Sequence, residues 1–211
     1  MNSINTYENC YFAIKLTSMY NYLYQKIKET ISITDDEFEF AITLFQPKKL
    51  RKKHFILQEG EVSKYSIFVE KGILRTYTID EKGNEHTLQL ASEGWWAADL
   101  YSFLTNEPSS FYIEALEDCE LFLISKQSWD DLMDKVPAFE RYFRILIQNN
   151  LVSTQRRLMG TLSQTAEEKY LSLTAAYPDL LLRVPQTLIA SYLGITPETL
   201  SRIRSQLATK R

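Results

Sequence analysis

Two apolar faces with helical spacing lie close together near the end of the chain, joined by a short polar turn. Their members are Leu188, Ile189, Tyr192 and Leu193 in the first face and Leu200, Ile203 and Leu207 in the second. Gly194 is expected to end the first helix, because a residue without Cβ adopts the left-handed conformation at low cost. Thr196 is a candidate N-cap, and Pro197 then stands at the first position of the next helix. The pattern predicts a helix-turn-helix, whose second helix enters the major groove of DNA.

Helical patterns also occur at the start of the chain and after its middle. Residues 7–31 contain neither Gly nor Pro, and Thr34 with Glu37 forms a capping box for a helix from Asp35 to about Phe45. Further helices are predicted to begin at Ser125, to span 137–161 and 166–176, and to break at Tyr177-Pro178-Asp179.

Between these helices the apolar positions alternate with a period of two. From Lys48 onward, short alternating runs separated by Gly-containing turns cover residues 54–57, 65–69, 73–79, 85–90, 112–115 and 120–124. Many short antiparallel strands are typical of a sandwich or barrel. We therefore expect an α+β chain with an N-terminal antiparallel β-barrel and flanking helices.

An irregular segment, residues 93–111, interrupts the strands and includes the aromatic residues Trp95, Trp96, Tyr101 and Phe103. A cross-over inside a barrel is a place where a small molecule can bind. The alternative is that the aromatic side chains plug the barrel. We favour the plug, because no polar clamp accompanies them.

The helix over 137–161 would be about 37 Å long at ~1.5 Å per residue, which exceeds one small domain. Its apolar positions recur at three and four: Phe139, Phe143, Leu146, Ile147, Leu151, Thr154 and Leu158. Part of this stripe should therefore face a second copy of the chain. A purely intrachain spine is the alternative.

Composition is that of a soluble globular protein, with 45% hydrophobic and 24% charged residues. The net charge is −3, but five cations and one acid after residue 182 give that end +4 and leave −7 for the rest. A basic end on an acidic body fits a small DNA-contact surface, whereas a solvated tail is the plainer reading. Its members are Arg183, Arg202, Arg204, Lys210 and Arg211, with Glu198 as the acid.

Cysteine content and the absence of targeting patterns suggest the cytoplasm. Cys10 and Cys119 have no metal-type spacing, so we predict neither a metal site nor an iron–sulfur cluster. Neither a membrane span nor a signal peptide is recognisable. We expect no enzyme, because His54 and His86 lie in predicted strands without a Cys or His partner and no nucleophile, P-loop or zinc motif occurs.

The second helix of the terminal unit carries side chains suited to DNA. Glu198 and Arg202 are four residues apart, so they can form an ion pair that holds both side chains in place. The carboxylate can accept a hydrogen bond from the cytosine amine, and the guanidinium can donate two to guanine. Thr196 and Thr199 can bind phosphate at the helix start. A helical hairpin with a surface salt bridge is the alternative, and the Gly, cap and Pro make it the weaker one.

The order of barrel, long helix and helix-turn-helix, with Gly60, the hairpin glycines and the run IASYLGITPETLSRI, resembles the Crp/Fnr family of bacterial transcription regulators over about residues 34–207. The resemblance implies an effector-type domain over 1–136, a dimerisation helix over 137–161 and a DNA-binding domain over 162–211. It implies double-stranded DNA, RNA polymerase and a second copy as partners. By this resemblance Glu198 and Arg202 fall on base-reading positions. Pro197 stands where family members often have a base-reading Arg. The positions that contact phosphate are Gln186, Thr187, Thr196 and Thr199.

The effector region departs from the cyclic-nucleotide-binding members of that family. They carry a Gly-Glu pair and, shortly after, an Arg that holds the cyclic phosphate. Here the matching residues are Ala98-Asp99 and Ser109-Ser110, and Thr154 matches a helix position that touches the base. Losing one partner of such a buried ion pair costs ~3–5 kcal/mol. We expect no tight binding of cyclic AMP and predict no cofactor, while an unknown, less charged effector stays open.

Many members of that family add a two-stranded wing after the second helix, whereas only seven residues follow Arg204 here, so we expect a helix-turn-helix without a full wing. Fewer phosphate contacts would give binding a shallower salt dependence. The alternative function is a small-molecule-binding or protein-interaction module whose helical end does not bind DNA.

Overall fold

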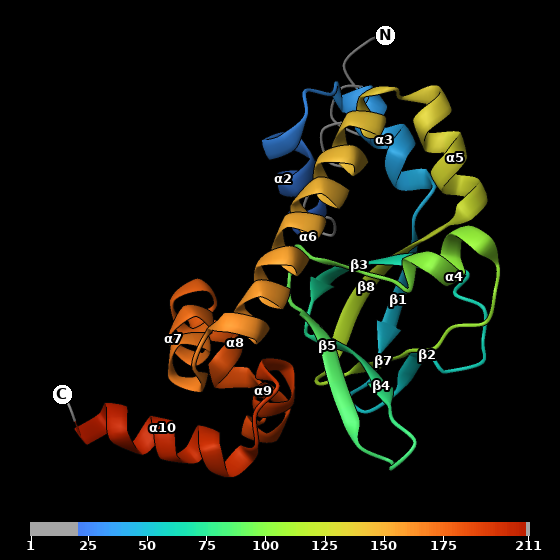
Figure 1. Cartoon of the computed structure of the whole chain (residues 1–211). Helices are drawn as coiled ribbons and strands as arrows, with labels where there is room; N and C mark the ends of the chain where they lie inside the picture. The colour runs from blue at the N-terminus through green and yellow to red at the C-terminus, as the bar shows by residue number, and fades with distance from the viewer. Residues whose placement is uncertain (1–20, 210–211) are drawn as a thin grey trace, which may run out of the picture.

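The structure is a computed structural model that describes residues 21–209. Most of the helix predicted over 7–31 lies outside the described residues, and so does Cys10. The described part of that predicted helix forms α2 (Asn21–Thr30). Figure 1 shows strands on one side, a long diagonal helix beside them, and a group of helices at the lower end. Among the described helices, none combines the length and apolar character that crossing a membrane requires.

Two four-stranded antiparallel sheets face each other and enclose an apolar core. The first sheet has the order β1 (Gln46–Leu50), β8 (Cys119–Ser125), β3 (Tyr65–Lys71), β6 (Trp96–Ala97). The second has the order β2 (Phe55–Leu57), β7 (Tyr112–Ala115), β4 (Leu74–Ile79), β5 (Glu85–Ala91). Ile67, Leu74 and Leu121 belong to the buried cluster that fills the space between them. The predicted α+β class with a jelly-roll-like β domain is confirmed.

A second apolar cluster covers the outer face of the first sheet. There α2, α3 (Asp35–Thr43), α5 (Lys126–Lys135) and the start of α6 (Ala138–Ser163) pack around Phe68, Phe122 and Phe139. The predicted capping box opens α3, since Thr34 accepts from the Glu37 N–H and Glu37 accepts from the Thr34 N–H. This cluster anchors the first turns of α6, so the rest of that helix projects away from it (Figure 1).

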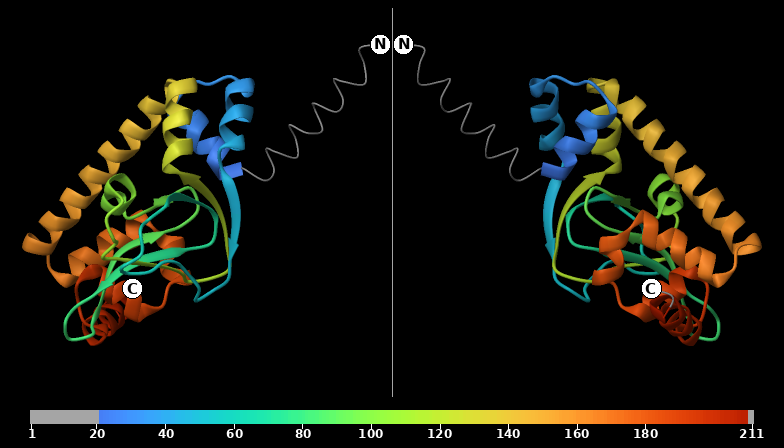
Figure 2. Two further views of the ribbon diagram at one scale, coloured as in Figure 1. Left: turned by 90° about the vertical axis from the view of Figure 1, so that its right-hand side faces the viewer. Right: turned by 90° about the vertical axis from the view of Figure 1, so that its left-hand side faces the viewer.

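The C-terminal helices pack on the outer face of the second sheet. They are α7 (Ala166–Ala176), α8 (Pro178–Arg183), α9 (Gln186–Leu193) and α10 (Pro197–Thr209). Ile73 and Leu90 from the sheet share one buried cluster with Leu180, Ile189 and Leu200 from the helices. Both views of Figure 2 place these helices at the lower end of the molecule.

Four elements were missing from the sequence-based prediction. Strand β1 has only Leu50 buried and carries no alternation, and its pairing with β8 holds it as an edge strand. Strand β6 and helix α4 (Leu100–Thr105) lie in the segment expected to be irregular. Helix α8 directly follows the predicted break, because Pro178 is well placed at a first helical position.

The expectation that the aromatic residues of 93–111 plug the barrel is wrong for two of them. Trp96 packs outside the barrel, with ring centroids 5.6 Å from Phe143 and 5.3 Å from Phe68. Tyr101 is 65% exposed. The helices over the first sheet offered Trp96 an apolar surface that the spacing of the segment could not reveal.

Candidate functional site

The helix-turn-helix has the predicted geometry. Gly194 ends α9 in the left-handed conformation at φ +67°, and the Ile195 N–H donates to the Ala190 carbonyl at 3.0 Å. The Thr199 N–H donates to Thr196 Oγ1 at 3.2 Å, as expected of an N-cap, and Pro197 is the first residue of α10. Leu200 and Ile203 are buried. The turn therefore fixes the angle at which α10 leaves the body.

The opposite side of α10 is open to solvent. Thr196, Pro197, Glu198 and Arg202 are exposed, while Thr199 is half-buried beside them. At the start of α9, Thr187 is exposed and Gln186 is half-buried, with its side-chain oxygen buried and without a hydrogen-bond partner. Six of the seven predicted DNA-contact residues thus lie at the starts of α9 and α10, and Arg202 lies in the second turn of α10.

The expected bracing of Glu198 by Arg202 is absent. No ion pair joins them among the described residues, and the pKa of Glu198 is lowered by hydrogen bonds from its own backbone N–H and from Thr196. Local donors at a helix start therefore outcompete a guanidinium one turn away. Arg202 consequently keeps its five donor hydrogens for another acceptor.

Helix α9 is hydrogen-bonded to the barrel. Ser191 Oγ donates to the Glu85 carbonyl at 3.0 Å and accepts from the Thr87 N–H at 3.0 Å. From α6, Arg157 donates to the Leu88 carbonyl and lies 5.1 Å from the ring centroid of Tyr192. Strand β5 therefore holds the helix-turn-helix in one orientation against the sheet.

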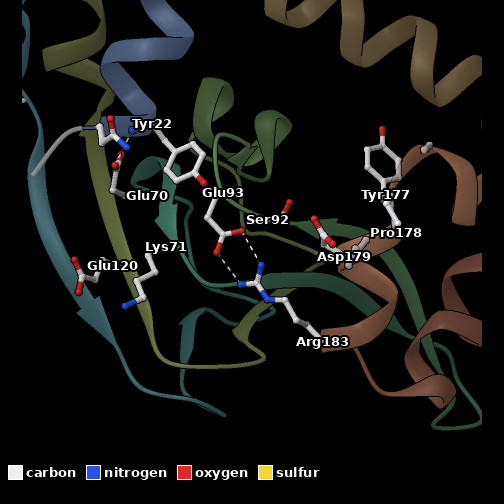
Figure 3. Close-up of a pocket in the computed structure, with 13 residues that line it drawn as sticks. Tyr22, Glu70, Lys71, Ser92, Glu93, Glu120, Tyr177, Pro178, Asp179 and Arg183 are labelled. Atoms are coloured by element: carbon white, nitrogen blue, oxygen red, sulfur yellow. Dashed lines mark hydrogen bonds and ion pairs between the residues drawn. The ribbon is translucent and has the colours of Figure 1, made fainter. Parts of the chain in front are cut away.

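An ion cluster reinforces this contact at the end of α8. Arg183 makes two hydrogen bonds to Glu93, at 2.9 and 2.7 Å (Figure 3). It also binds Glu117. The Gly72 N–H donates to Glu93 at 2.9 Å. Burial alone would raise the pKa of Glu93, but the hydrogen bonds from Arg183 and Gly72 hold it below its usual range. The cluster borders a cleft of about 690 Å³ between the barrel and α8.

This cluster corrects the expected basic surface. Arg183 is bound to two carboxylates and does not belong to a free cationic end, and Lys210 and Arg211 lie outside the described residues. The two carboxylates that bind Arg183 are 90 and 66 residues away in the chain, so no local sequence pattern could predict them.

A buried arginine below α9 also escaped the sequence-based prediction. Arg75 on β4 pairs with Glu85 at 2.6 Å and Glu114 at 3.0 Å and lies 4.0 Å from the ring centroid of Tyr77. Burial and the neighbouring carboxylates raise the pKa of Tyr77 to about 12. The network ties three strands together under the helix-turn-helix.

In the effector region only two of the five predicted residues come together. Asp99 is buried and caps α4, accepting from the Ser102 N–H at 3.1 Å, and it accepts from Ser109 Oγ at 2.8 Å. Ser110 and Thr154 are exposed, and Ala98 is half-buried. Both carboxylate oxygens of Asp99 are therefore used within the chain.

A cavity of about 450 Å³ lies between β6 and α6. Trp95, Trp96 and Trp129 contribute aromatic walls, and Gln89, Asn149 and Asn150 contribute amides. Its one lining cation is Lys26, which is already paired with Glu29 at 2.9 Å. This chemistry suits a small uncharged or weakly polar molecule better than a phosphate. Within residues 21–209 no acidic, His or Cys cluster is arranged to hold a metal ion.

The second half of α6 leaves its apolar residues uncovered. Ile147, Leu151, Leu158 and Leu162 are exposed, Leu162 by 76%. Phe139 and Phe143 of the same helix are buried. The predicted stripe is therefore divided into an anchored half and an open half.

Comparison with known proteins agrees with this architecture. Residues 47–136 match the family model of the cyclic nucleotide-binding domain. The regulatory protein HlyX of Actinobacillus pleuropneumoniae is 28% identical over 169 residues, which are 74% of this chain and 69% of that protein. The fumarate and nitrate reduction regulatory protein of Vibrio cholerae is 25% identical over 189 residues, covering 82% and 73%.

Solved structures show the same fold. FixK2 from Bradyrhizobium japonicum superposes with a TM-score of 0.69 at 22% identity, covering 79% of this chain and 85% of that one. The catabolite activator protein of Thermus thermophilus gives a TM-score of 0.55 at 22% identity, covering 85% of each chain.

The domain match, the two sheets and the terminal helices define a chain that joins a cyclic-nucleotide-binding-like domain to a helix-turn-helix. The relatives are named as regulators, not as enzymes. Over most of its length the chain is therefore similar to proteins named as regulators, and its residues 47–136 match the cyclic nucleotide-binding domain.

Proposed function

We propose that this chain binds a two-fold symmetric DNA site as a homodimer, with α10 in the major groove, and that it regulates transcription from that site. The observation that carries the proposal is the start of α10, which is held by buried Leu200 and Ile203 on one side and exposed on the other. A helix fixed in this way can present side chains to base edges without reordering.

Within this proposal Arg202 reads guanine and Glu198 accepts from cytosine. Arg202 suits the role because no carboxylate of the described chain occupies it. Thr196 and Thr199 at the start of α10, and Gln186 and Thr187 at the start of α9, bind phosphates and set the register. Pro197 contacts the DNA without donating a hydrogen bond, which would give the site a different base preference from one read by Arg at that position.

The open half of α6 supports the homodimer. Leu151, Leu158 and Leu162 stand on one helix and are exposed among residues 21–209, and pairing two such helices would remove them from water. In functional terms residues 1–136 form the effector-type domain, 137–161 the pairing helix and 162–211 the DNA-binding domain. RNA polymerase is the expected further partner, and the cytoplasm is the compartment where both partners are found.

The effector region supports regulation without tight binding of cyclic AMP. The position at which a bound phosphate would need a cation is taken by Ser109-Ser110, and the carboxylate oxygens of Asp99 are already satisfied by Ser102 and Ser109. An uncharged ligand in the cavity beside Trp96 remains the effector that the lining favours.

Selection of bound duplexes from a random pool tests the proposal. A two-fold symmetric consensus is expected, because a dimer presents two α10 helices. Arg202→Ala should weaken binding to the selected duplex by ~1–3 kcal/mol and relax one base position in each half-site. Arg204→Ala, which removes an exposed arginine from the same helix, is the matched control and should leave the consensus unchanged. Failure to enrich any sequence would favour the interaction module that does not bind DNA.

A further inference from the structure

A cavity of about 760 Å³ lies where the end of α6 meets α7 and α9, and we call it the junction cavity. Its walls are residues between 152 and 164, residues between 169 and 177, and Tyr192 with Leu193 of α9. Figure 1 shows the lower end of α6 next to α7. The volume lies in the range of small-molecule sites in proteins. A molecule bound there would contact the long helix and the helix-turn-helix at the same time.

The charged residues that line the junction cavity all have the same sign. Arg156, Arg157 and Lys169 are part of the lining, and none of the described residues that line it is Asp or Glu. In the whole chain, acids outnumber Lys and Arg by 27 to 24. The cleft beside α8 shows the more ordinary balance, since four carboxylates and two cations line it. The junction cavity therefore concentrates positive charge within an acidic chain.

The three cations of the junction cavity have no acidic partner among residues 21–209. The ion pairs of the described chain involve none of them. Glu168 directly precedes Lys169, but it accepts hydrogen bonds from the Thr165 N–H at 2.8 Å and from the Thr165 hydroxyl at 3.0 Å. This carboxylate thus caps α7 and does not line the cavity. The charge of the cavity is left for an anion from outside the described chain.

Arg157 is held in position at the wall of the junction cavity. Its guanidinium donates to the Leu88 carbonyl on β5 and lies 5.1 Å from the ring centroid of Tyr192. An arginine has five N–H donors, so the bond to Leu88 leaves others for a ligand. Because its position is already set, Arg157 would lose little side-chain freedom when it binds an anion.

The remaining lining is apolar, aromatic or uncharged. Leu173 and Leu193 are buried, and Tyr177 and Tyr192 are half-buried. Uncharged hydrogen-bonding groups come from α6, its C-cap and α7, at Ser153, Gln155, Thr161, Ser163, Gln164 and Ser172. Small-molecule sites typically combine an apolar lining with a few polar groups that fix the orientation of the ligand. The lining therefore suits a molecule that carries negative charge on a flat, apolar body.

Pairing of two α6 helices would leave the junction cavity accessible. Arg156 follows Leu151 by five residues and precedes Leu158 by two. At about 100° per residue, Arg156 lies on the far side of the helix from both leucines. The exposed leucine stripe and the cavity thus use different faces of α6.

We propose that the junction cavity binds a small organic dianion with a ring-shaped body, held by Arg156, Arg157 and Lys169. A guanidinium suits bidentate binding of a phosphate or carboxylate group, and the ammonium adds a point charge. The cavity beside Trp96 differs in chemistry, because its one lining cation is already paired. The inference goes beyond the proposed function and does not require α10 to bind DNA.

A bound dianion would join α6 to α7 and α9. Arg156 and Arg157 belong to α6, Lys169 belongs to α7, and Tyr192 belongs to α9. Contacts to all three helices would stabilise the orientation in which α9 rests on β5. The site therefore offers a means of fixing the helix-turn-helix that is separate from the effector region of the barrel.

Calorimetric titration of the full chain with simple ring compounds tests the inference. Phenyl phosphate carries a charge of ~−2 at neutral pH, and phthalate places two carboxylates on the same ring. At least one of these dianions should bind about tenfold or more tightly than inorganic phosphate or phenol, each of which offers only charge or only the ring. The tighter of the two identifies the anionic group. Absence of binding by both dianions at millimolar concentration would overturn the inference.

A pair of charge variants locates the site. Arg156→Gln/Lys169→Gln should weaken binding of the preferred dianion by about tenfold or more, because charge-assisted hydrogen bonds are lost. Lys82→Gln/Arg141→Gln removes two exposed cations that lie outside the lining and should bind as the unmodified chain does. Melting temperatures close to that of the unmodified chain confirm that both variants are folded. Equal weakening in both would show a general effect of net charge and overturn the inference.

Hydrogen exchange of the unmodified chain gives an independent test of position. The preferred dianion should slow amide exchange at the end of α6 and in α7 and α9. Ser153 and Tyr177 line both this cavity and the one beside Trp96, so a ligand in either could affect them. Protection that is confined to β6 and α4, without any in α7, would place the ligand beside Trp96 and overturn the inference.

Discussion

The effector region and the helix-turn-helix contain similar polar residues, but these residues are buried and hydrogen-bonded in the first region and exposed in the second. Asp99 and Ser109 lie inside the barrel domain, where each accepts or donates within the chain at 2.8 to 3.1 Å. Thr196, Glu198 and Arg202 lie at the surface, where Arg202 has no acidic partner among the described residues. A polar residue that is buried and saturated stabilises the fold, whereas one that is exposed and unsaturated can still bind a ligand.

Two arginines of the C-terminal region show the same contrast. Arg183 binds Glu93 and Glu117 and connects the helical unit to the barrel. Arg202 stands on a helix whose other side is buried, and its guanidinium reaches solvent. Charge counted along the sequence treats the two alike, although only the second is available to DNA.

The largest expected effect comes from Asp99→Ala. The change removes the N-cap of α4 and leaves the buried Ser109 hydroxyl without its acceptor, so the free energy of unfolding should fall by about 2–4 kcal/mol. Urea denaturation followed by circular dichroism measures it. Glu198→Ala is the surface counterpart, and it should alter the selected DNA sequence while leaving the urea midpoint nearly unchanged. Equal stability of the two variants would break the contrast between the regions.

An intermediate effect is expected for Arg183→Gln, which should cost about 1–2 kcal/mol because a partly exposed, charge-assisted bridge is lost. The pKa of Glu93 is lowered in the folded chain, so the bridge contributes fully above the usual carboxyl pKa of 4.5 and is lost as the pH falls through the lower, folded value. The variant should therefore show less acid sensitivity than the unmodified chain.

Unfolding free energies measured from neutral pH down through the carboxyl range test this prediction. Arg204→Gln removes an exposed arginine that makes no ion pair with the described residues, and it serves as the control. Hydrogen exchange should also quicken in α8 and α9 of the Arg183 variant, because the bridge holds α8 to the barrel. Identical pH profiles for both variants would show that the bridge adds nothing to stability.

The smallest expected effect is that of cyclic AMP on the melting temperature. A ligand present at one hundred times its dissociation constant stabilises the folded state by ~2.7 kcal/mol. With Asp99 and Ser109 saturated by each other, millimolar cyclic AMP should produce no measurable shift. A clear rise in melting temperature would show that the effector region still accepts a phosphate.

Local patterns were sufficient for much of this fold. The left-handed Gly194, the Thr196 cap and the apolar spacing around Leu200 each depend on residues within one or two turns, so the helix-turn-helix could be read directly. Alternation with a period of two likewise predicted the longer strands. The capping box at Thr34 placed the start of α3 at Asp35.

Pairings between distant segments could not be read in this way. The Arg183–Glu93 bridge spans 90 residues, and β1 is a strand because β8 supplies its hydrogen bonds. Trp96 packs on helices that come before and after the barrel in the chain. Spacing along a chain encodes which face a residue shows, because backbone geometry repeats over a few residues. Which partner meets that face depends on the folded arrangement of segments whose separation carries no such repeat.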